Sequence, residues 1–297
     1  MRLRTGAFLA ALVVATVGST LTSAGGPGSG TARTGTVLVD GRLRSYRVFE
    51  PARLRTPVPV VVVLHGGFGN AEGTARQTGF DDQAARSGFL AVYPNGIGRA
   101  WNAGECCGLP ARAGIDDVAF VVRLLDRLEV RYDVDEHRVY ATGISNGGLL
   151  AYRLACERAP RFAAVAPVAA TMVVACDPAL PVSVLHVHGS ADRNIPIAGG
   201  RGTKGVSRVD WPPVESALAA WRTTNRCSEP ARVVTRGAVT RMAWSCPDRV
   251  DVELVEIAGG GHSWPGGERL SRILDSPSGA LDATPEIWRF FAAHPRR

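Results

Sequence analysis

The stretch HRVYATGISNGGLLAYRLA, residues 137–155, decides the fold. Its first part, 137–142, is an apolar run typical of a strand, and 148–155 is compatible with a helix. Between them, 143–147 read Gly-Ile-Ser-Asn-Gly, the G-x-S-x-G pattern of a strained turn that lifts a serine hydroxyl above a sheet edge. Ser145 is therefore the predicted nucleophile. The alternative interpretation is a serine that caps a buried helix.

A serine hydroxyl needs a general base, which an acid orients. His262 lies in a glycine-rich segment, 259–267, directly after a predicted strand at 252–257, and it is the predicted base. The alternative for His262 is an ordinary surface-loop histidine. His186 and His188 belong to an apolar stretch that predicts a buried strand, so we interpret both as core residues.

The acid is expected on the loop after the strand that contains these two histidines. Asp192 follows that strand at the sheet edge where open α/β sheets bind their ligands, and it is the predicted acid. An Asx-turn aspartate is the alternative reading of the same residue. Three other aspartates compete with it, although none follows a buried strand so directly: Asp177, Asp210 and Asp251.

Donors for a tetrahedral oxyanion are expected at two places. One is the backbone N–H of Asn146, the residue after the nucleophile. The other follows the apolar run 57–64, which ends in His-Gly-Gly at 65–67. Gly67 N–H is the first choice there and Phe68 N–H the second, with His65 holding the loop through a hydrogen bond.

Five segments together resemble the secreted polyhydroxybutyrate-depolymerase-like esterases, a group that includes feruloyl and acetylxylan esterases: 64–67, 101–108, 143–148, 188–192 and 260–266. The likeness spans roughly residues 35 to 295. It implies an α/β-hydrolase fold, hydrolysis of carboxylic esters and no cofactor. It leaves the substrate open among hydroxybutyrate oligomers, feruloyl or acetyl esters of plant polysaccharide, and small synthetic esters.

The order of predicted elements agrees with that fold. Strands near 36–39 and 44–49 flank Asp40-Gly41, a strong hairpin signal. Strands and helices then alternate, which predicts a doubly wound, mostly parallel sheet with an N-terminal antiparallel hairpin. The strands are expected near 58–64, 89–93, 137–142, 163–168 and 182–188, and the helices near 73–87, 116–130, 211–226 and 285–293.

The chain divides into three predicted segments: a signal peptide at 1–24, a disordered leader at 25–34 and a single catalytic domain at 35–297. The first has two arginines, an apolar stretch and a small-residue exit, and no later apolar run reaches membrane length. We expect an exported protein that is free of the membrane, with a monomer as the default state. Its formal net charge of +7 is spread along the sequence, which argues against a nucleic-acid-binding patch.

Six cysteines in an exported chain predict disulfides. Cys227 and Cys246 bracket a predicted hairpin and form the favoured pair. For the others, either Cys106 or Cys107 pairs with Cys156 or Cys176, or the first two form a vicinal bridge. No Cys-x-x-Cys or His-Cys spacing supports a metal site, so none is predicted.

The long loop 94–114 is expected to cover the pocket. Phe68, Trp101 and Trp264 flank the catalytic loops and are predicted to line an aromatic-friendly acyl pocket, with plain packing as the alternative for each. Two other functions are compatible with these residues. One is a secreted serine peptidase, and the other is a non-catalytic binding protein on a hydrolase scaffold.

Overall fold

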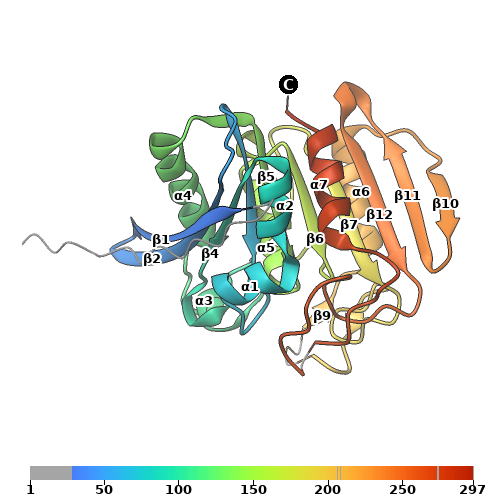
Figure 1. The fold of residues 1–297 in the computed structure, drawn as a ribbon. Coiled ribbons are helices and arrows are strands. Elements are labelled where there is room, and N and C mark those ends of the chain that lie inside the picture. Colours follow the sequence, from blue (N-terminus) through green and yellow to red (C-terminus); the bar gives the residue numbers. More distant parts are fainter. Residues whose placement is uncertain (1–28, 206, 208, 273, 297) are drawn as a thin grey trace, which may run out of the picture.

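The computed structural model describes residues 29–205, 207, 209–272 and 274–296 (Figure 1). The predicted signal peptide and the first residues of the predicted leader lie outside this range. One ten-stranded sheet runs through the molecule in the order β1-β2-β4-β3-β5-β6-β7-β12-β11-β10. In chain order its strands are β1 (Gly30–Val39), β2 (Arg42–Pro51), β3 (Val58–Leu64), β4 (Leu90–Pro94), β5 (Val134–Ile144), β6 (Ala164–Val168), β7 (Ser183–Gly189), β10 (Arg232–Arg236), β11 (Val239–Ser245) and β12 (Asp251–Ile257).

The six central strands, β4 to β12 in sheet order, are parallel, and antiparallel strands flank them at both ends. This arrangement confirms the predicted fold class. A separate two-stranded sheet is formed by β8 (Gly200–Arg201) and β9 (Asp210–Trp211). The helices are α1 (Ala71–Thr78), α2 (Phe80–Ser87), α3 (Gly108–Arg112), α4 (Asp117–Arg131), α5 (Asn146–Glu157), α6 (Val214–Asn225) and α7 (Ala283–Ala293), with short 3₁₀ turns at η1 (Ile97–Arg99), η2 (Ala159–Arg161) and η3 (Pro247–Arg249).

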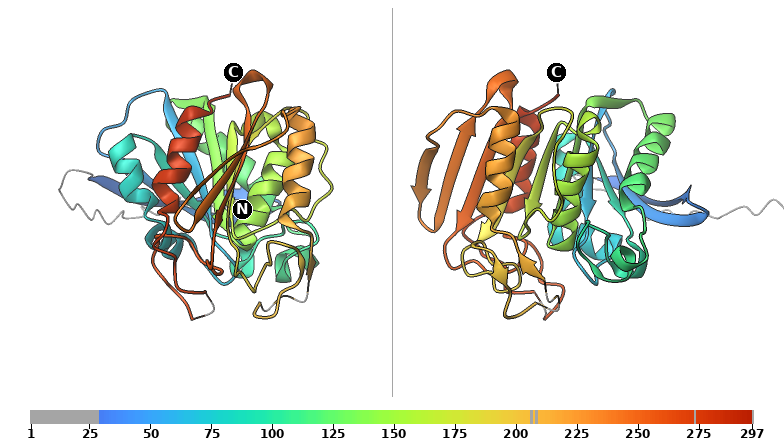
Figure 2. Two further views of the ribbon diagram at one scale, coloured as in Figure 1. Left: turned by 90° about the vertical axis from the view of Figure 1, so that its right-hand side faces the viewer. Right: turned by 180° about the vertical axis from the view of Figure 1, so that it is seen from behind.

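Helices cover both faces of the sheet, as the two views in Figure 2 show. Strand β3 shows this two-sided packing: all seven of its residues are buried, and from Val60 to Leu64 they alternate between the two hydrophobic cores. Val60 and Val62 belong to the core that contains α4, α5 and α6, whereas Val61 and Val63 belong to the core that contains α1, α2 and α7. A continuous apolar strand of this kind is typical of a central parallel strand.

Two predicted boundaries are wrong for local reasons. The single helix expected at 73–87 is two helices, because Gly79 adopts a left-handed conformation (φ 65°) that ends α1 and precedes α2. The helix expected from Trp211 begins only at Val214, after two prolines, and Trp211 itself belongs to β9. The hairpin prediction is confirmed, with positive φ at both Asp40 and Gly41.

The predicted disordered leader is also too long. Residues 30–34 are part of β1 and pair with the end of β2, from Gly30 opposite Pro51 to Thr34 opposite Arg47. Arg33 adds an ion pair to Glu50 at 3.6 Å. Strand pairing therefore extends five residues into a segment whose glycine- and serine-rich beginning predicted disorder.

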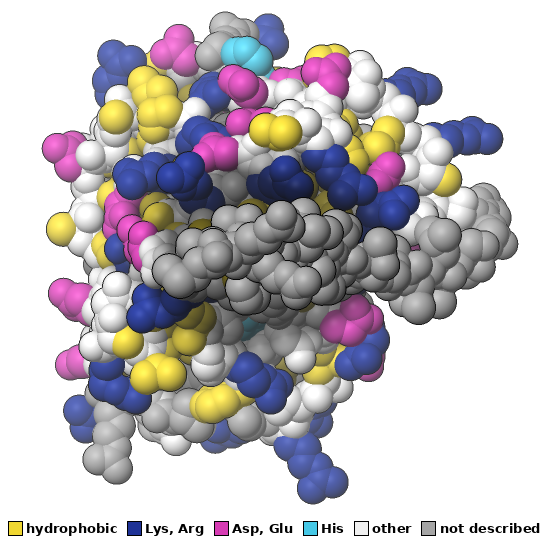
Figure 3. Space-filling view, turned by 90° about the vertical axis from the view of Figure 1, so that its left-hand side faces the viewer, with side chains coloured by type: hydrophobic (Ala, Val, Ile, Leu, Met, Phe, Trp, Pro, Cys, Tyr) yellow, Lys and Arg dark blue, Asp and Glu magenta, His cyan; other side chains and the backbone are white. Residues whose placement is uncertain are grey.

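Three disulfides join Cys106 to Cys107, Cys156 to Cys176, and Cys227 to Cys246. The last confirms the favoured pair, and the first is the vicinal bridge that the sequence left open. Among the described helices, none is both long enough and apolar enough to cross a bilayer. On the face in Figure 3, basic side chains are interspersed with acidic and apolar ones.

His294, just after α7, makes contacts whose contribution to the stability of the fold depends on pH. Its Nε2 lies 2.9 Å from Asp251 Oδ2 and its Nδ1 lies 2.7 Å from the Phe290 carbonyl oxygen. Burial opposes the charged form, but the contacts with Asp251 and Phe290 outweigh it and raise the pKa of His294. A histidine with a raised folded-state pKa stabilises the fold fully below its unfolded value, about 6.5, and the contribution disappears as pH rises through the folded value.

We therefore expect wild type to exceed His294→Gln in melting temperature by a margin that is largest below about pH 6.5 and shrinks at higher pH. Thermal unfolding of both proteins across that range measures the margin. His137→Gln is the control, because His137 is exposed and its Nδ1 contacts a backbone carbonyl oxygen, that of Arg296, rather than a carboxylate. A difference in melting temperature that is constant with pH would show that ionisation of His294 does not stabilise the fold.

Candidate active site

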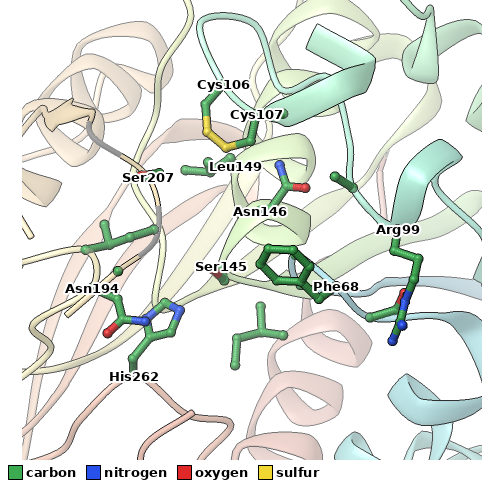
Figure 4. A pocket seen from close by; sticks show the side chains of 18 of the residues that line it. Phe68, Arg99, Cys106, Cys107, Ser145, Asn146, Leu149, Asn194, Ser207 and His262 are labelled. Atoms are coloured by element: carbon green, nitrogen blue, oxygen red, sulfur yellow. A yellow bond between two sulfur atoms is a disulfide. The ribbon is translucent and has the colours of Figure 1, made fainter. Parts of the chain in front are cut away.

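The carboxyl ends of four parallel strands bring the predicted site residues to one edge of the sheet. Gly67 follows β3, Ser145 follows β5, Asp192 follows β7 and His262 follows β12. Ser145, His262, Gly67, Phe68 and Asn146 line the same cavity, which has a volume of about 860 Å³ (Figure 4). Ligand sites of open α/β sheets are expected at this edge.

Ser145 has the backbone of a strained turn. Its φ is 55° and its ψ is −124°, outside the regions that an L-residue adopts readily, and its N–H donates to the Val168 carbonyl oxygen at 2.9 Å. The turn is tight enough to require glycine on either side. A Cβ on Gly147 would lie 2.3 Å from the Leu64 carbonyl oxygen, and one on Gly143 would lie 2.7 Å from the Gly147 carbonyl carbon.

His262 and Asp192 form a buried pair. His262 Nδ1 lies 2.7 Å from Asp192 Oδ2, and both residues are less than a tenth exposed. The other carboxylate oxygen of Asp192 accepts backbone N–H bonds from Asn194 at 2.8 Å and Ile195 at 3.0 Å. With Nδ1 donating to the carboxylate, the neutral imidazole has its acceptor at Nε2.

The rival aspartates lie in other environments. Asp251 contacts His294, and Asp210 is exposed on β9. An acid that the sequence did not indicate, Asp275, accepts the backbone N–H of His262 at 2.8 Å and pairs with Lys204. Slight burial acts against ionisation of Asp275, but the bonds from Lys204 and His262 prevail and lower its pKa. This carboxylate fixes the backbone of the His262 loop.

The predicted oxyanion donors, the N–H groups of Gly67 and Asn146, differ in their hydrogen bonding from the second-choice donor, the N–H of Phe68. Within the described part of the chain, no acceptor is bonded to the N–H of Gly67 or of Asn146. Phe68 N–H, in contrast, donates to the Arg99 carbonyl oxygen at 2.7 Å. Gly67 and Asn146 therefore keep their donors available at the cavity, while the donor of Phe68 holds the loop that contains Arg99.

His65 organises these loops, as the sequence predicted. Its Nδ1 contacts the Gly66 carbonyl oxygen at 2.8 Å, and its Nε2 accepts the Gly96 N–H at 2.9 Å. Burial is the main cause that lowers the pKa of His65 to about 4, so the ring is neutral at physiological pH. A neutral ring can act as donor at one nitrogen and acceptor at the other, which these two bonds require.

Of the three aromatic residues predicted to line the pocket, only Phe68 does so. Phe68 is 55% exposed and its ring lies beside Ser145 in the cavity (Figure 4). Trp101 and Trp264 do not line the cavity, and their prediction as acyl-pocket residues is wrong. Both indoles are fully buried, with Trp101 Nε1 donating to the His65 carbonyl oxygen and Trp264 Nε1 to Thr284 Oγ1. Core packing and these hydrogen bonds occupy the indole surfaces, so neither ring is available to contact a substrate.

Sequence reasoning missed the side chain of Asn146. Its Oδ1 accepts the Trp101 N–H at 2.7 Å and its Nδ2 donates to the Trp101 carbonyl oxygen at 3.0 Å. This pair of bonds ties the loop above the cavity to the turn that contains Ser145. The loop itself, which was expected to cover the pocket, lines the cavity with residues that include the disulfide-bonded Cys106 and Cys107 (Figure 4).

Comparison with known proteins identifies this architecture. The model of a family described as esterase PHB (polyhydroxybutyrate) depolymerase matches residues 44–208. The chain belongs to this esterase family. A putative esterase, NocK, from Nocardia uniformis subsp. tsuyamanensis is 34% identical over 254 residues, which are 78% of this chain and 73% of that protein. A probable feruloyl esterase C from Aspergillus niger is 27% identical over 73% of this chain and 84% of its own length.

A solved structure shares the fold of this esterase at low identity. The acetyl xylan esterase from Aspergillus awamori superposes with a TM-score of 0.58 at 14% identity, over 78% of this chain and 94% of that one. The resemblance to polyhydroxybutyrate-depolymerase-like esterases is thus confirmed, and the protein is a carboxylic ester hydrolase. Among the described residues, no group of three or more His, Cys, Asp or Glu side chains is arranged to hold a metal ion.

Proposed function

We propose that this esterase is an exported serine hydrolase in which Ser145 is the nucleophile, His262 the general base and Asp192 the acid. The observation that supports this most strongly is the buried 2.7 Å contact between His262 and Asp192 beside a cavity that Ser145 also lines. His262 Nε2 takes the Ser145 proton as Oγ attacks the ester carbonyl. Asp192 stabilises the imidazolium and holds its tautomer.

The tetrahedral oxyanion is held by the N–H groups of Gly67 and Asn146. Loss of one such donor typically raises the barrier by about 3 kcal/mol. His262 then protonates the leaving alcohol, and water repeats the cycle on the acyl-enzyme. Phe68 is proposed to contact the substrate, because its ring is exposed beside Ser145 in the cavity.

The proposed substrates are hydroxybutyrate-type oligomers or feruloyl and acetyl esters of plant polysaccharide. Two observations support these substrates. The cavity of about 860 Å³ is large enough for an aromatic acyl group or several hydroxyacyl units, and its lining combines Phe68 and Leu149 with polar groups. Relatives by sequence or fold are also named as feruloyl and acetyl xylan esterases. Export is proposed because three disulfides suit an oxidising compartment.

A labelling and substrate comparison tests this proposal. The purified protein is expected to react with a fluorophosphonate probe and to hydrolyse p-nitrophenyl acetate, but not a peptide anilide. Methyl ferulate, acetylated xylan and hydroxybutyrate oligomers then identify the preferred ester by their kcat/KM values. A folded protein that takes up no label would be a binding protein on a hydrolase scaffold, and turnover of the anilide would make it a peptidase.

A further inference from the structure

A string of buried polar groups that the proposed chemistry does not use ends beside Asp192. Tyr152 on α5 contacts His186 Nδ1 at 2.8 Å, and His186 Nε2 contacts His188 Nδ1 at 2.9 Å. His188 Nε2 lies 2.9 Å from the Ile195 carbonyl oxygen and 3.6 Å from Asp192 Oδ2. All three side chains are at most 1% exposed.

When both imidazole rings are neutral, the chemistry of these atoms fixes the direction of every bond. The Ile195 carbonyl can only accept, so His188 Nε2 carries a proton. If His188 is neutral, its Nδ1 accepts from the Nε2–H of His186, and the Nδ1 of His186 then accepts from the Tyr152 hydroxyl. Burial lowers the pKa of both histidines, which agrees with two neutral rings. The string has one proton arrangement and a hydroxyl donor at its far end.

Neutrality matters because His188 faces the same carboxylate oxygen that contacts His262. A positively charged His188 would share the negative charge of Asp192 with His262. A neutral His188 does not, so the carboxylate charge stabilises protonated His262 alone. Other titratable groups near this region are Asp275, which accepts the His262 N–H, its partner Lys204, and Glu256, which lies opposite His188 in the register of β12 and β7. Within the described residues, no hydrogen bond or ion pair joins any of these three groups to Tyr152, His186 or His188.

We propose that Tyr152, His186 and His188 are positioning residues of the ester-hydrolysing site: they hold one N–H against Ile195 and Asp192 and so fix the loop that orients the acid. This inference rests on the proposed roles of Asp192 and His262. His186 and His188, two residues apart on β7, point to the same side of the sheet as α5, which explains how one strand and one helix form the string.

Two variants of His188 test the proposal. Gln carries an amide N–H about as far along its side chain as Nε2, whereas Asn stops near Nδ1. We expect His188→Asn to lower kcat by about ten- to a hundredfold with little change in KM, because a loosened Asp192 stabilises the imidazolium less well. For the same reason the acid limb of kcat/KM against pH should move to lower pH. His188→Gln should restore most of kcat and the wild-type limb.

Two buried tyrosines provide a matched comparison at the other end. Tyr152→Phe removes the terminal donor, whereas the Tyr140 hydroxyl is buried without a described partner. Tyr152→Phe should lower kcat several-fold, and Tyr140→Phe should leave it unchanged. In wild type, ¹⁵N NMR at pH 7 should show both histidines protonated at Nε2 alone.

The results separate this inference from the proposed function. If wild type hydrolyses esters through Ser145 but the acid limb of His188→Asn stays in place or moves to higher pH, the positioning role is wrong and the proposed function stands. A protonated Nδ1 on either histidine would likewise overturn it. If wild type has no Ser145-dependent activity, the proposed function fails first, and the NMR measurement still reports the proton arrangement.

Discussion

Replacing Ser145 by alanine is expected to lower kcat for p-nitrophenyl acetate by at least about 10⁴-fold. The hydroxyl is the proposed nucleophile, so its loss removes the acyl-enzyme route and leaves only binding and oxyanion stabilisation. KM should change little, since the cavity keeps its shape. Steady-state kinetics and fluorophosphonate labelling measure the effect. Residual activity above about a thousandth of wild type would place the nucleophile elsewhere.

Stability measurements on the same residue test the strain of the turn. Ser145→Ala keeps a Cβ at φ 55°, so its melting temperature should stay close to that of wild type. Ser145→Gly removes the Cβ and should gain about 1 kcal/mol of unfolding free energy relative to the alanine variant. Equal stabilities of the two variants would mean that the positive φ stores no strain.

Much of this fold could be predicted because each element has its own local signal. The seven-residue apolar run of β3 and the Asp40-Gly41 turn are read from adjacent residues alone. The residues of the proposed triad were likewise predicted from loops after strands, because parallel strands end at one edge. The pair formed by Asp192 and His262 is 70 residues apart in sequence, and only strand order brings it together.

What the sequence did not predict depends on packing. Trp101 and Trp264 adjoin the motifs of the proposed site, yet the direction of a side chain at a loop is set by tertiary contacts. Asn146 was predicted for its N–H only, because no local pattern reveals that its amide would hold a segment 45 residues away. The roles of His186 and His188 were similarly hidden, since an apolar strand predicts burial and says nothing of the partners.

Replacing Asp117 by alanine is expected to cost about 3–5 kcal/mol of unfolding free energy, because it breaks a buried ion pair. Asp117 Oδ1 lies 2.5 Å from an Arg44 nitrogen, and the two side chains are 0% and 3% exposed. Its other oxygen accepts the Asn102 N–H at 2.7 Å. The substitution leaves a buried guanidinium without a counter-charge and an N–H without its acceptor.

Glu215→Ala is the control, because it also breaks an arginine pair, at 2.6 Å with Arg222, but the carboxylate is 63% exposed. It should cost less than about 1 kcal/mol. Urea unfolding of both variants measures the difference. Because Asp117 also holds the loop above the cavity through Asn102, its loss should lower kcat/KM as well, while Glu215→Ala leaves it unchanged. Similar costs for the two variants would mean that the Asp117 pair contributes no more than a surface contact.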